Sequence, residues 1–459
     1  MQISLGSLAQ AAGGKLVCGH EQMIITGVST DSRQVKEGEV FFALPGEKFD
    51  GHDFVAQAFA KGAKAAVVSR VNCSLLDGFE QGLILVDDTV QALQALASAW
   101  RLQYKIPLIA ITGSVGKTTT RDLLSAVLST RWTTLTTYGN FNNDIGLPLT
   151  LLRLRGEHQA AVVEMAMRAP GEILRLVRVA QPTAAIITNV EPVHLETLGS
   201  LENIARAKCE ILASVQDFAV INGDNSLLKK EAANYSCPCY TFGYNEDCDF
   251  RIQQVKLNQH KLEVAVRMIK EPACFEFAVP SRQLAYNIIA AAAVAYLYGF
   301  NIDEIQQGLA AYRPTGNRLH ISPLRGGGIL INDTYNANPV SMAAALETGR
   351  ELAGSSRFVA VLGDMYELGD YETEGHKAVG AKAAQVGVDL LVTIGEKGSI
   401  VAREAQKQGL PPERVYHFPA KEDSIDFLRT QVSKQDTVLF KASRGLQLET
   451  LVDEWLKDE

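Results

Sequence analysis

A glycine turn between an apolar run and an amphipathic stretch constrains the fold of this chain most. The run 106–110 predicts a buried strand, the segment 112–119 contains the turn, and residues 121–128 predict a helix. This arrangement cradles phosphate, because backbone N–H groups and the helix N-terminus both face the anion. Lys117 would add a positive charge and Thr118 a hydroxyl for magnesium. We therefore predict a nucleotide site formed by Gly113, Ser114, Val115, Gly116, Lys117, Thr118 and Thr119.

The spacing of the two glycines narrows this prediction. The usual phosphate-binding loop has four residues between its glycines, whereas here only Ser114 and Val115 separate Gly113 from Gly116. The shorter form points to a smaller set of ATP users. The plain alternative is a glycine turn that merely starts a helix, but the preceding strand and the following Lys-Thr pair favour a phosphate site.

Length, charge and composition set the broad class. A chain of 459 residues is too long for one compact core, so several domains are expected. The net charge is −8 and no run of Lys or Arg suggests nucleic acid or lipid as a partner. The first residues lack the pattern of a signal peptide, the longest apolar stretch is too short for a membrane span, and the cysteines lack zinc-site spacing. We expect a cytoplasmic protein with reduced thiols.

The hydrophobic pattern divides the chain into three segments. Residues 1–85 have short strands and turns, residues 86–313 alternate strands with helices, and residues 314–459 begin a second alternating series. Alternation of this kind builds a parallel, doubly wound sheet. We predict an α/β protein of three domains: a small N-terminal α/β domain, a central P-loop-type ATP domain and a C-terminal Rossmann-like domain.

The predicted elements are as follows. Strands are expected at 23–29, 40–46, 65–69, 160–164, 184–188, 218–222, 328–332, 357–362, 390–394 and 437–441. Helices are expected at 54–61, 89–103, 170–180, 201–212 and 284–298, and a β-hairpin at 250–268.

Two polar side chains follow predicted central strands. Glu164 ends the run 160–164, and His194 follows the run 184–188. Side chains at the carboxyl ends of parallel strands face the ligand crevice, where a carboxylate can bind magnesium. The alternatives are a carboxylate that stabilises the next helix and a structural histidine. The position of both residues near the cradle favours a role in the site.

Lys208 lies on the apolar face of a predicted helix. At about 100° per residue, it falls in the middle of the stripe formed by Leu201, Ile204, Ala205, Ile211 and Leu212. Burial lowers the pKa of an amine, and a neutral amine can add carbon dioxide to form a carbamate, which is an anionic metal ligand. The alternative is a side chain that extends along the apolar surface to water.

Polar residues also open the C-terminal segment. Asp333 follows the run 328–332, so its carboxylate is expected at the crevice, where it can accept hydrogen bonds from a ribose. Arg318 can reach a phosphate. Because Asn and Asp are frequent turn residues, a purely structural role remains open for this region.

Taken in order along the chain, these residues resemble the Mur ligases, the ATP-dependent amide ligases of peptidoglycan synthesis. The resemblance covers essentially the whole chain and rests on Thr112–Thr119, Glu164, His194, Ala207-Lys208 and Asp333. Two positions differ from the family's usual pattern. Ala166 stands where glycine is common, and Ala442 occupies a variable position before Ser443-Arg444.

The resemblance implies a reaction and a set of catalytic residues. The γ-phosphate of ATP moves to a peptide carboxylate, and an amine then displaces phosphate from the acyl phosphate. One magnesium would be held by Thr118 and the phosphates, and another by Glu164, His194 and carbamylated Lys208, with Lys117 completing the catalytic set. Asn287 would lie near the adenine, Arg318 near the phosphates and Asp333 at the ribose.

The resemblance is narrower for members that join D-alanyl-D-alanine to UDP-N-acetylmuramoyl-tripeptide. The matching stretches are 30–33, 41–46, 139–146, 335–339 and 362–369. In such a member Ser32 and Arg33 would contact UDP, and Asn142 and Asn143 would lie in the substrate site. The dipeptide would meet Asn336, Asn338 and Ser443. We expect a monomer.

Three other functions are weighed against this one. A sibling ligase adds the third amino acid to UDP-MurNAc-dipeptide, but its diaminopimelate-binding form usually has Asp-Asn-Pro-Arg, whereas this chain has Asn336-Ala-Asn-Pro339 without the arginine. Folylpolyglutamate synthetase normally carries the short cradle near its N-terminus. A non-catalytic ATP-binding switch would not need the separate set of Glu164, His194 and Lys208.

Overall fold

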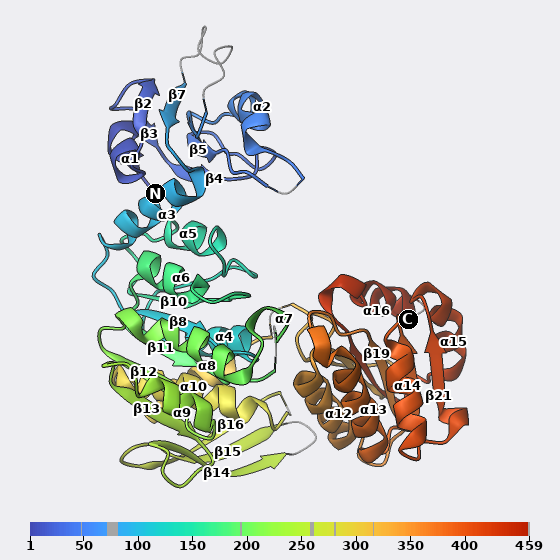
Figure 1. Ribbon diagram of the computed structural model, residues 1–459. Helices are drawn as coiled ribbons and strands as arrows, with labels where there is room; N and C mark the ends of the chain where they lie inside the picture. The colour runs from blue at the N-terminus through green and yellow to red at the C-terminus, as the bar shows by residue number, and fades with distance from the viewer. Residues whose placement is uncertain are drawn as a thin grey trace.

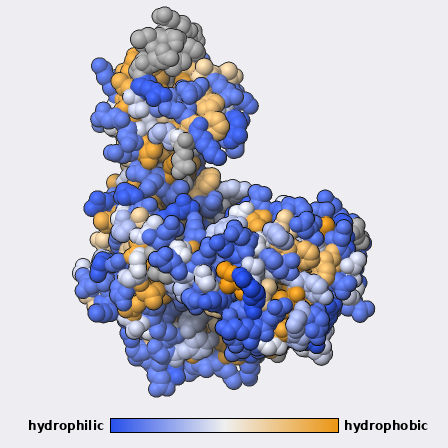
Figure 2. Space-filling view, turned by 45° about the vertical axis from the view of Figure 1, so that its right-hand side comes forward, coloured by the Kyte–Doolittle hydropathy of each residue, from blue (hydrophilic) through white to orange (hydrophobic). Residues whose placement is uncertain are grey.

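The computed structural model describes residues 1–46, 48–70, 81–192, 195–257, 261–279, 281–314 and 316–457. These residues form three α/β parts, each built around its own large sheet (Figure 1). The first part stands on the second, and the third lies beside the second (Figure 1). The predicted three-domain α/β architecture is therefore confirmed. No helix in the described ranges is both long and apolar enough to cross a membrane, and hydrophilic residues cover most of the face in Figure 2.

The first part contains a five-stranded sheet in the order β2-β7-β6-β5-β4 and a small pair, β1-β3. The single strand predicted over 23–29 is wrong, because the chain changes partners at Thr26: Ile25 pairs with β1, whereas Gly27 pairs with β5. The elements are β1 (Ile3–Ser4), α1 (Leu5–Ala11), β2 (Lys15–Cys18), β3 (Ile24–Ile25), β4 (Gly27–Ser29), β5 (Glu39–Phe42), η1 (Gly51–Phe54), α2 (Val55–Ala60), β6 (Ala65–Val68) and β7 (Gly82–Leu85).

The helix α3 (Thr89–Arg101) joins the first part to the second. One continuous apolar core runs from Leu5 and Val40 in the first part through Leu93 and Leu96 of α3 to Leu108 in the second. Asp88 caps α3 by accepting hydrogen bonds from the N–H groups of Val90 and Gln91. The first and second parts are thus packed together through this helix.

The second part contains a nine-stranded sheet in the order β16-β15-β14-β13-β12-β11-β8-β10-β9. Its elements are β8 (Leu108–Thr112), α4 (Lys117–Leu128), β9 (Thr134–Thr136), α5 (Gly146–Leu151), β10 (Ala160–Glu164), α6 (Glu172–Ala180), β11 (Ala184–Ile187), α7 (Leu195–Leu198), α8 (Leu201–Cys209), η3 (Glu210–Ser214), β12 (Phe218–Asn222), α9 (Ser226–Ala232), β13 (Cys239–Gly243), β14 (Phe250–Leu257), β15 (Leu262–Arg267), β16 (Pro272–Phe277), α10 (Leu284–Leu297) and α11 (Ile302–Ala311).

The predicted cradle follows β8, the strand at which the order of the strands in the sheet reverses. β8 pairs in parallel with β10 on one side and with β11 on the other. The chain therefore runs from β8 to one side of the sheet and returns to the other side, and ligands of doubly wound sheets bind at such a switch point. The predicted hairpin is confirmed as β14–β15, and β16 extends it to three strands.

The third part contains a six-stranded sheet in the order β17-β18-β22-β19-β20-β21, which is parallel except for β17. Its elements are β17 (His320–Pro323), β18 (Ile329–Asn332), α12 (Pro339–Ala353), β19 (Phe358–Gly363), η4 (Gly369–Tyr371), α13 (Glu372–Gln385), β20 (Leu390–Ile394), α14 (Gly398–Lys407), η5 (Pro412–Arg414), β21 (Val415–Phe418), η6 (Glu422–Ser424), α15 (Ile425–Gln431), β22 (Thr437–Lys441), η7 (Arg444–Leu446) and α16 (Glu449–Leu456).

Candidate active site

The cradle loop follows β8, and its two glycines are required by its shape. Gly113 has φ 147° and Gly116 has φ 84°. A Cβ atom at Gly113 would lie 1.9 Å from Thr188 Oγ1, and one at Gly116 would lie 2.5 Å from Asn287 Nδ2. Bare backbone is therefore needed at both positions. Gly116 also caps the N-terminus of α4, whose first amides have no partner within the helix.

The loop after β11 holds the cradle in place. Asn189 accepts hydrogen bonds from Ser114 N at its carbonyl and from Val115 N at its side chain, at 3.1 and 2.9 Å. Lys117 Nζ donates to the carbonyls of Gly113 and Ser114 at 2.7 and 3.2 Å. Its ammonium thus lies over the loop. Burial lowers the pKa of Lys117, although the Glu164 carboxylate opposes this effect.

Glu164 lies beside the cradle because its strand is in register with β8. Glu164 pairs with Ile111, and its side chain is buried. Thr118 Oγ1 donates to Glu164 Oε2 at 2.9 Å, and Asn142 Nδ2 donates to Oε1 at 2.9 Å. Arg121 Nη1 lies 3.4 Å from Oε2. The Glu164 carboxylate and the Thr118 hydroxyl form a compact pair of oxygen donors at the first turn of α4.

Lys208 is 2% exposed, which confirms that it points into the packed face of α8. Desolvation lowers the pKa of Lys208 well below its usual value, and the charge of Lys117 lowers it further. An amine in this environment is neutral more readily than a surface lysine and is therefore a better nucleophile for carbon dioxide.

The donor set fits a magnesium ion only in part. In the described part of the chain, no three His, Cys, Asp or Glu side chains come together to hold a metal. His194 lies outside the described residues. Glu164 and Thr118 supply hard oxygen donors, and a carbamate on Lys208 would add another. Together with phosphate oxygens, these groups are of the kind that magnesium prefers.

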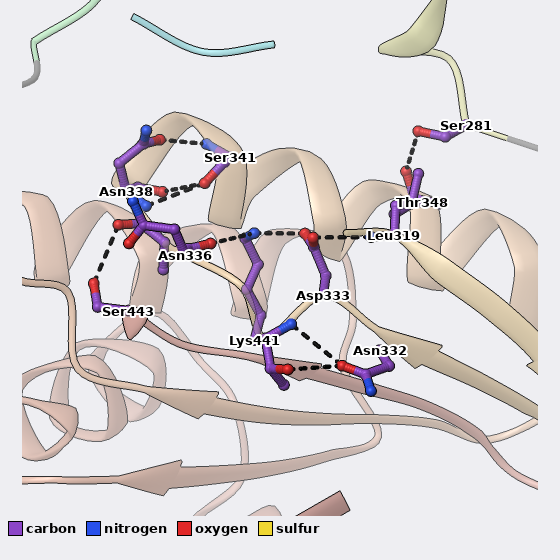
Figure 3. A network of polar contacts seen from close by, with 12 residues as sticks. Ser281, Leu319, Asn332, Asp333, Asn336, Asn338, Ser341, Thr348, Lys441 and Ser443 are labelled. Atoms are coloured by element: carbon purple, nitrogen blue, oxygen red, sulfur yellow. Dashed lines mark hydrogen bonds and ion pairs between the residues drawn. The ribbon is translucent and has the colours of Figure 1, made fainter. Parts of the chain in front are cut away.

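The opposite wall of the site belongs to the third part. Asn332 of β18 pairs with Phe440 of β22, so the next residues, Asp333 and Lys441, lie side by side. Lys441 Nζ donates to Asp333 Oδ2 at 2.5 Å and to the Asn336 carbonyl at 3.0 Å, as Figure 3 shows. Leu319 N donates to Asp333 Oδ1 at 3.0 Å. Both oxygens of this carboxylate are thereby oriented.

Two further predicted residues, Arg318 and Asn287, line the same cavity. The Arg318 guanidinium stacks on the Tyr335 ring at 3.9 Å from its centroid. Asn287 Nδ2 donates to Gly116 O at 3.3 Å and to Thr120 Oγ1 at 2.9 Å. Asn287 therefore links α10 to the start of α4, directly beside the cradle.

A cavity of about 190 Å³ joins the two parts of the site. It lies between the second and third parts, which also meet where Ser281 Oγ is 3.0 Å from Thr348 Oγ1 and Arg282 pairs with Glu351 at 2.6 Å. Its lining includes Ser114, Val115, Gly116, Lys117, Thr118, Thr119, Glu164, Asn287, Arg318, Asp333, Asn336, Asn338 and Lys441. Residues more than 300 positions apart in the sequence, such as Ser114 and Lys441, thus face one space.

The remaining predicted residues lie outside this lining. Ser32 donates to Gln57 Oε1 at 2.7 Å and Arg33 pairs with Asp31 at 2.9 Å, both in the first part. Asn143 Oδ1 accepts from Gly146 N at the start of α5. Ser443 Oγ accepts from Tyr366 N at 2.9 Å and donates to Ala337 O at 3.3 Å, so it fixes two loops behind the cavity.

Three residues of the site were not predicted from the sequence: Lys441, Asn189 and Arg121. Lys441 ends the predicted strand 437–441, so the rule that identified Glu164 and Asp333 applies to it equally. Asn189 lies two residues after the end of β11 and falls under the same rule. No sequence pattern predicts burial of Arg121, because an arginine in the first turns of a helix is expected at the surface.

The sequence matches family models along most of its length. The models described as "Mur ligase family, catalytic domain", "Mur ligase middle domain" and "Mur ligase, glutamate ligase domain" match residues 24–101, 111–295 and 317–444, respectively.

Similar proteins cover the chain almost completely. The UDP-N-acetylmuramoyl-tripeptide--D-alanyl-D-alanine ligase of Bacillus subtilis is 39% identical over 95% of this chain and 94% of its own length. The Escherichia coli enzyme of the same name is 34% identical, with 98% of both chains covered. A crystal structure of MurF from Acinetobacter baumannii has a TM-score of 0.90 at 31% identity and covers 100% of this chain and 99% of its own. MurF from Thermotoga maritima in complex with ADP has a TM-score of 0.83 at 28% identity, covering 94% and 97%.

Proposed function

The chain belongs to the Mur ligase family, and we propose that it joins D-alanyl-D-alanine to UDP-N-acetylmuramoyl-tripeptide at the expense of ATP. Two relatives named UDP-N-acetylmuramoyl-tripeptide--D-alanyl-D-alanine ligase, at 39% and 34% identity, align with nearly the whole chain. The observation that carries the proposal is the cavity in which the cradle of the second part faces Asp333 and Asn336 of the third.

The cradle would bind the triphosphate of ATP. The Gly116 backbone and the N-terminus of α4 offer amides to phosphate oxygens, and Lys117 adds a positive charge. Phosphoryl transfer needs mainly alignment and charge neutralisation. The donor carboxylate attacks the γ-phosphorus and ADP leaves. The dipeptide amine then attacks the acyl carbon, phosphate leaves, and the amine loses a proton.

Magnesium is the metal that this donor set would take. One magnesium ion would be held by Thr118 and the phosphates, and another by Glu164, His194 and a carbamate on Lys208. Both would offset the negative charge of the carboxylate and the phosphates. The carbamate forms when the neutral Lys208 amine bonds to the carbon of CO₂ and a proton is lost. The lowered pKa of Lys208 supports this step.

The substrates would occupy different parts of the chain. We assign the segment 1–85 to UDP, through Ser32 and Arg33, the segment 86–313 to ATP, and the segment 314–459 to the dipeptide and part of the nucleotide. Asn287, Arg318 and Asp333 would contact adenine, phosphate and ribose. Asn142 and Asn143 would face the donor, and Asn336, Asn338 and Ser443 the dipeptide.

The position of the cavity between two parts has a chemical consequence. An acyl phosphate hydrolyses if water reaches it, so the two parts must enclose it during the reaction. Arg168 of the second part pairs with Glu367 of the third at 3.3 Å, at another contact between these parts. We expect closure of this interface to accompany catalysis.

A substrate panel tests the proposed reaction. Phosphate release should require ATP, UDP-MurNAc-tripeptide and D-alanyl-D-alanine together. Release that depends instead on the muramoyl-dipeptide with diaminopimelate or lysine would identify the sibling ligase. ATP binding without any amide product would identify a switch. The Lys117→Ala variant should keep the wild-type circular dichroism spectrum and lose phosphate release.

Two glycine variants test the cradle itself. Gly116 and Gly171 both cap helices with similar positive φ, 84° and 82°. A Cβ atom at Gly116 meets Asn287 at 2.5 Å, whereas at Gly171 the nearest atom is 4.0 Å away. The positive φ should cost both alanine variants about 1 kcal/mol of stability, and the contact with Asn287 should add to this cost in Gly116→Ala. Only Gly116→Ala should lose ADP binding in calorimetry, and equal binding by both variants would argue against the cradle.

A further inference from the structure

Lys441 is almost completely buried and lies at the boundary between two functional regions of the third part. Only 2% of its surface is exposed. Its ammonium lies between the Asp333 carboxylate at 2.5 Å and the Asn336 carbonyl at 3.0 Å, as Figure 3 shows. Asp333 is the proposed ribose contact, and Asn336 is a proposed dipeptide contact. One cation therefore bridges both.

The hydrogen bonds of this ammonium leave capacity for a ligand. A lysine ammonium has three N–H groups, and within the described residues two protein oxygens, from Asp333 and Asn336, accept from it. Lys441 lines the cavity between the second and third parts. The remaining N–H is therefore available to a molecule in that space.

The segment that Lys441 holds is rigid at its other end. Asn338 caps α12 by accepting from Ser341 N at 2.8 Å, and Ser341 Oγ accepts from Asn338 N at 3.1 Å. Ser443, two residues after Lys441, donates to Ala337 O. The end of β22 thus fixes the segment 336–338 at two points, and a shift of the Asp333–Lys441 pair would be transmitted to it.

The Lys441–Asp333 pair is largely shielded from water, with side chains 3% and 15% exposed, and such a pair is weak evidence of a net contribution to stability. Removing two charges from water is costly, and apolar replacements are often as stable. A role in function accounts better for the pair.

We propose that Lys441 is a positioning residue that couples nucleotide binding to binding of the amine substrate. A nucleotide that orders Asp333 also orders Lys441, and through the Asn336 carbonyl it orders the turn that receives the dipeptide. This inference rests on the proposed function, because it takes D-alanyl-D-alanine as the second ligand. By thermodynamic linkage, each ligand then raises the affinity for the other by the same factor.

Calorimetry on the full chain measures this coupling. D-alanyl-D-alanine is titrated in the presence of UDP-MurNAc-tripeptide and Mg²⁺, with and without a saturating non-hydrolysable ATP analogue. In the wild type, the analogue should raise dipeptide affinity about tenfold. Lys441→Met should reduce this factor to about one, and Lys441→Arg, which keeps the charge, should restore part of it.

Lys421→Met is the matched control. Lys421 lies in the same part of the protein and donates to the carbonyls of Leu446 and Gln447, both at 3.1 Å, but it is not among the residues that line the cavity. Its variant should keep the full coupling factor. An undiminished factor in Lys441→Met, or an equal loss in Lys421→Met, would overturn the proposal.

Asp333→Asn separates positioning from a general loss of structure. If Lys441 acts through Asp333, the double variant Asp333→Asn/Lys441→Met should show no less coupling than either single variant. Additive losses would contradict this. Absence of dipeptide binding in the wild type under every condition would instead refute the proposed function. If Lys441→Met does not fold, Lys441→Arg and Asp333→Asn still decide the question.

Discussion

A lysine is buried near the end of α8 and another at the end of β22, and the two differ in the partners that surround the side-chain amine. Lys208 and Lys441 are both 2% exposed. Lys441 donates to a carboxylate and a carbonyl. No described residue makes a hydrogen bond or ion pair with the side-chain amine of Lys208, and the nearby charge that affects its pKa is that of another lysine, Lys117.

This comparison shows that burial alone does not determine the chemical role of a lysine side chain. A buried amine without a counter-ion loses its proton more readily and becomes a nucleophile. A buried amine with a carboxylate partner holds its neighbours in place through its ion pair and hydrogen bonds. The first arrangement suits covalent modification of Lys208, and the second suits the positioning role that we propose for Lys441.

The largest expected effect is the loss of ligation in Lys208→Ala. Without the proposed carbamate the site would lack one anionic metal ligand, and activity should fall about 100-fold or more. Added bicarbonate cannot modify alanine, but bicarbonate or short carboxylates should enter the vacated space and partly restore phosphate release. Lys117→Ala is the control, because it removes a cation that these anions cannot replace. Unchanged activity in Lys208→Ala would remove the contrast between the two lysines.

The second effect is on stability at the end of β22. Lys441→Met leaves the partly buried Asp333 carboxylate without its cation and should lower the free energy of unfolding by about 2 kcal/mol. Asp333→Leu/Lys441→Met removes both charges and should recover most of that loss while nucleotide binding stays impaired. Urea denaturation together with ADP calorimetry checks both results. Equal stability of Lys441→Met and the wild type would show that the pair is solvated.

A third effect has the opposite sign. Lys208→Met removes a buried amine that has no counter-ion among the residues that the structure describes, so in buffer free of carbon dioxide it should raise the free energy of unfolding by about 1 kcal/mol. The same substitution at Lys441 destabilises, so the two Lys→Met variants should move the urea midpoint in opposite directions. A loss of stability in both variants would show that each side chain contributes mainly by packing.

The sequence was sufficient for features that depend on neighbouring residues. The cradle between Gly113 and Thr118 lies within one short segment, so its strand, turn and helix start are all visible in the local pattern. Burial of Lys208 follows from helical periodicity alone. Both were predicted because no information about other segments was needed.

Features that depend on strand order were not predictable. Asp333 and Lys441 meet because β22 returns to pair with β18, and a sequence does not give the order of strands in a sheet. The same limit explains the wrong strand over 23–29, where the pairing partner changes at Thr26. The helix predicted over 201–212 ends as α8 at Cys209 and continues as the 3₁₀ turn η3 from Glu210, which is a common way for a helix to end.

The smallest expected effect extends the comparison to buried carboxylates. Asp364 and Asp436 are both 5% exposed. Asp436 pairs with Arg357 at 3.3 Å, whereas Asp364 Oδ1 accepts from Gly398 N at 2.8 Å. Burial raises the pKa of Asp364 despite that hydrogen bond.

An aspartate in the unfolded chain titrates near pH ~3.9. Between that pH and the raised pKa of Asp364, the native state binds more protons than the unfolded state, so the free energy of unfolding falls as pH rises. Asp364→Asn, which keeps an acceptor for Gly398 N, should therefore be more stable than the wild type at neutral pH by about 1 kcal/mol or less. Its advantage should disappear below pH ~4. Urea midpoints measured across this range check the sign, and Asp436→Asn, which loses an ion pair, should show no gain at any pH. A stabilised Asp436→Asn would mean that an arginine partner does not offset burial of a carboxylate, and the contrast between paired and unpaired buried charges would then hold only for lysine.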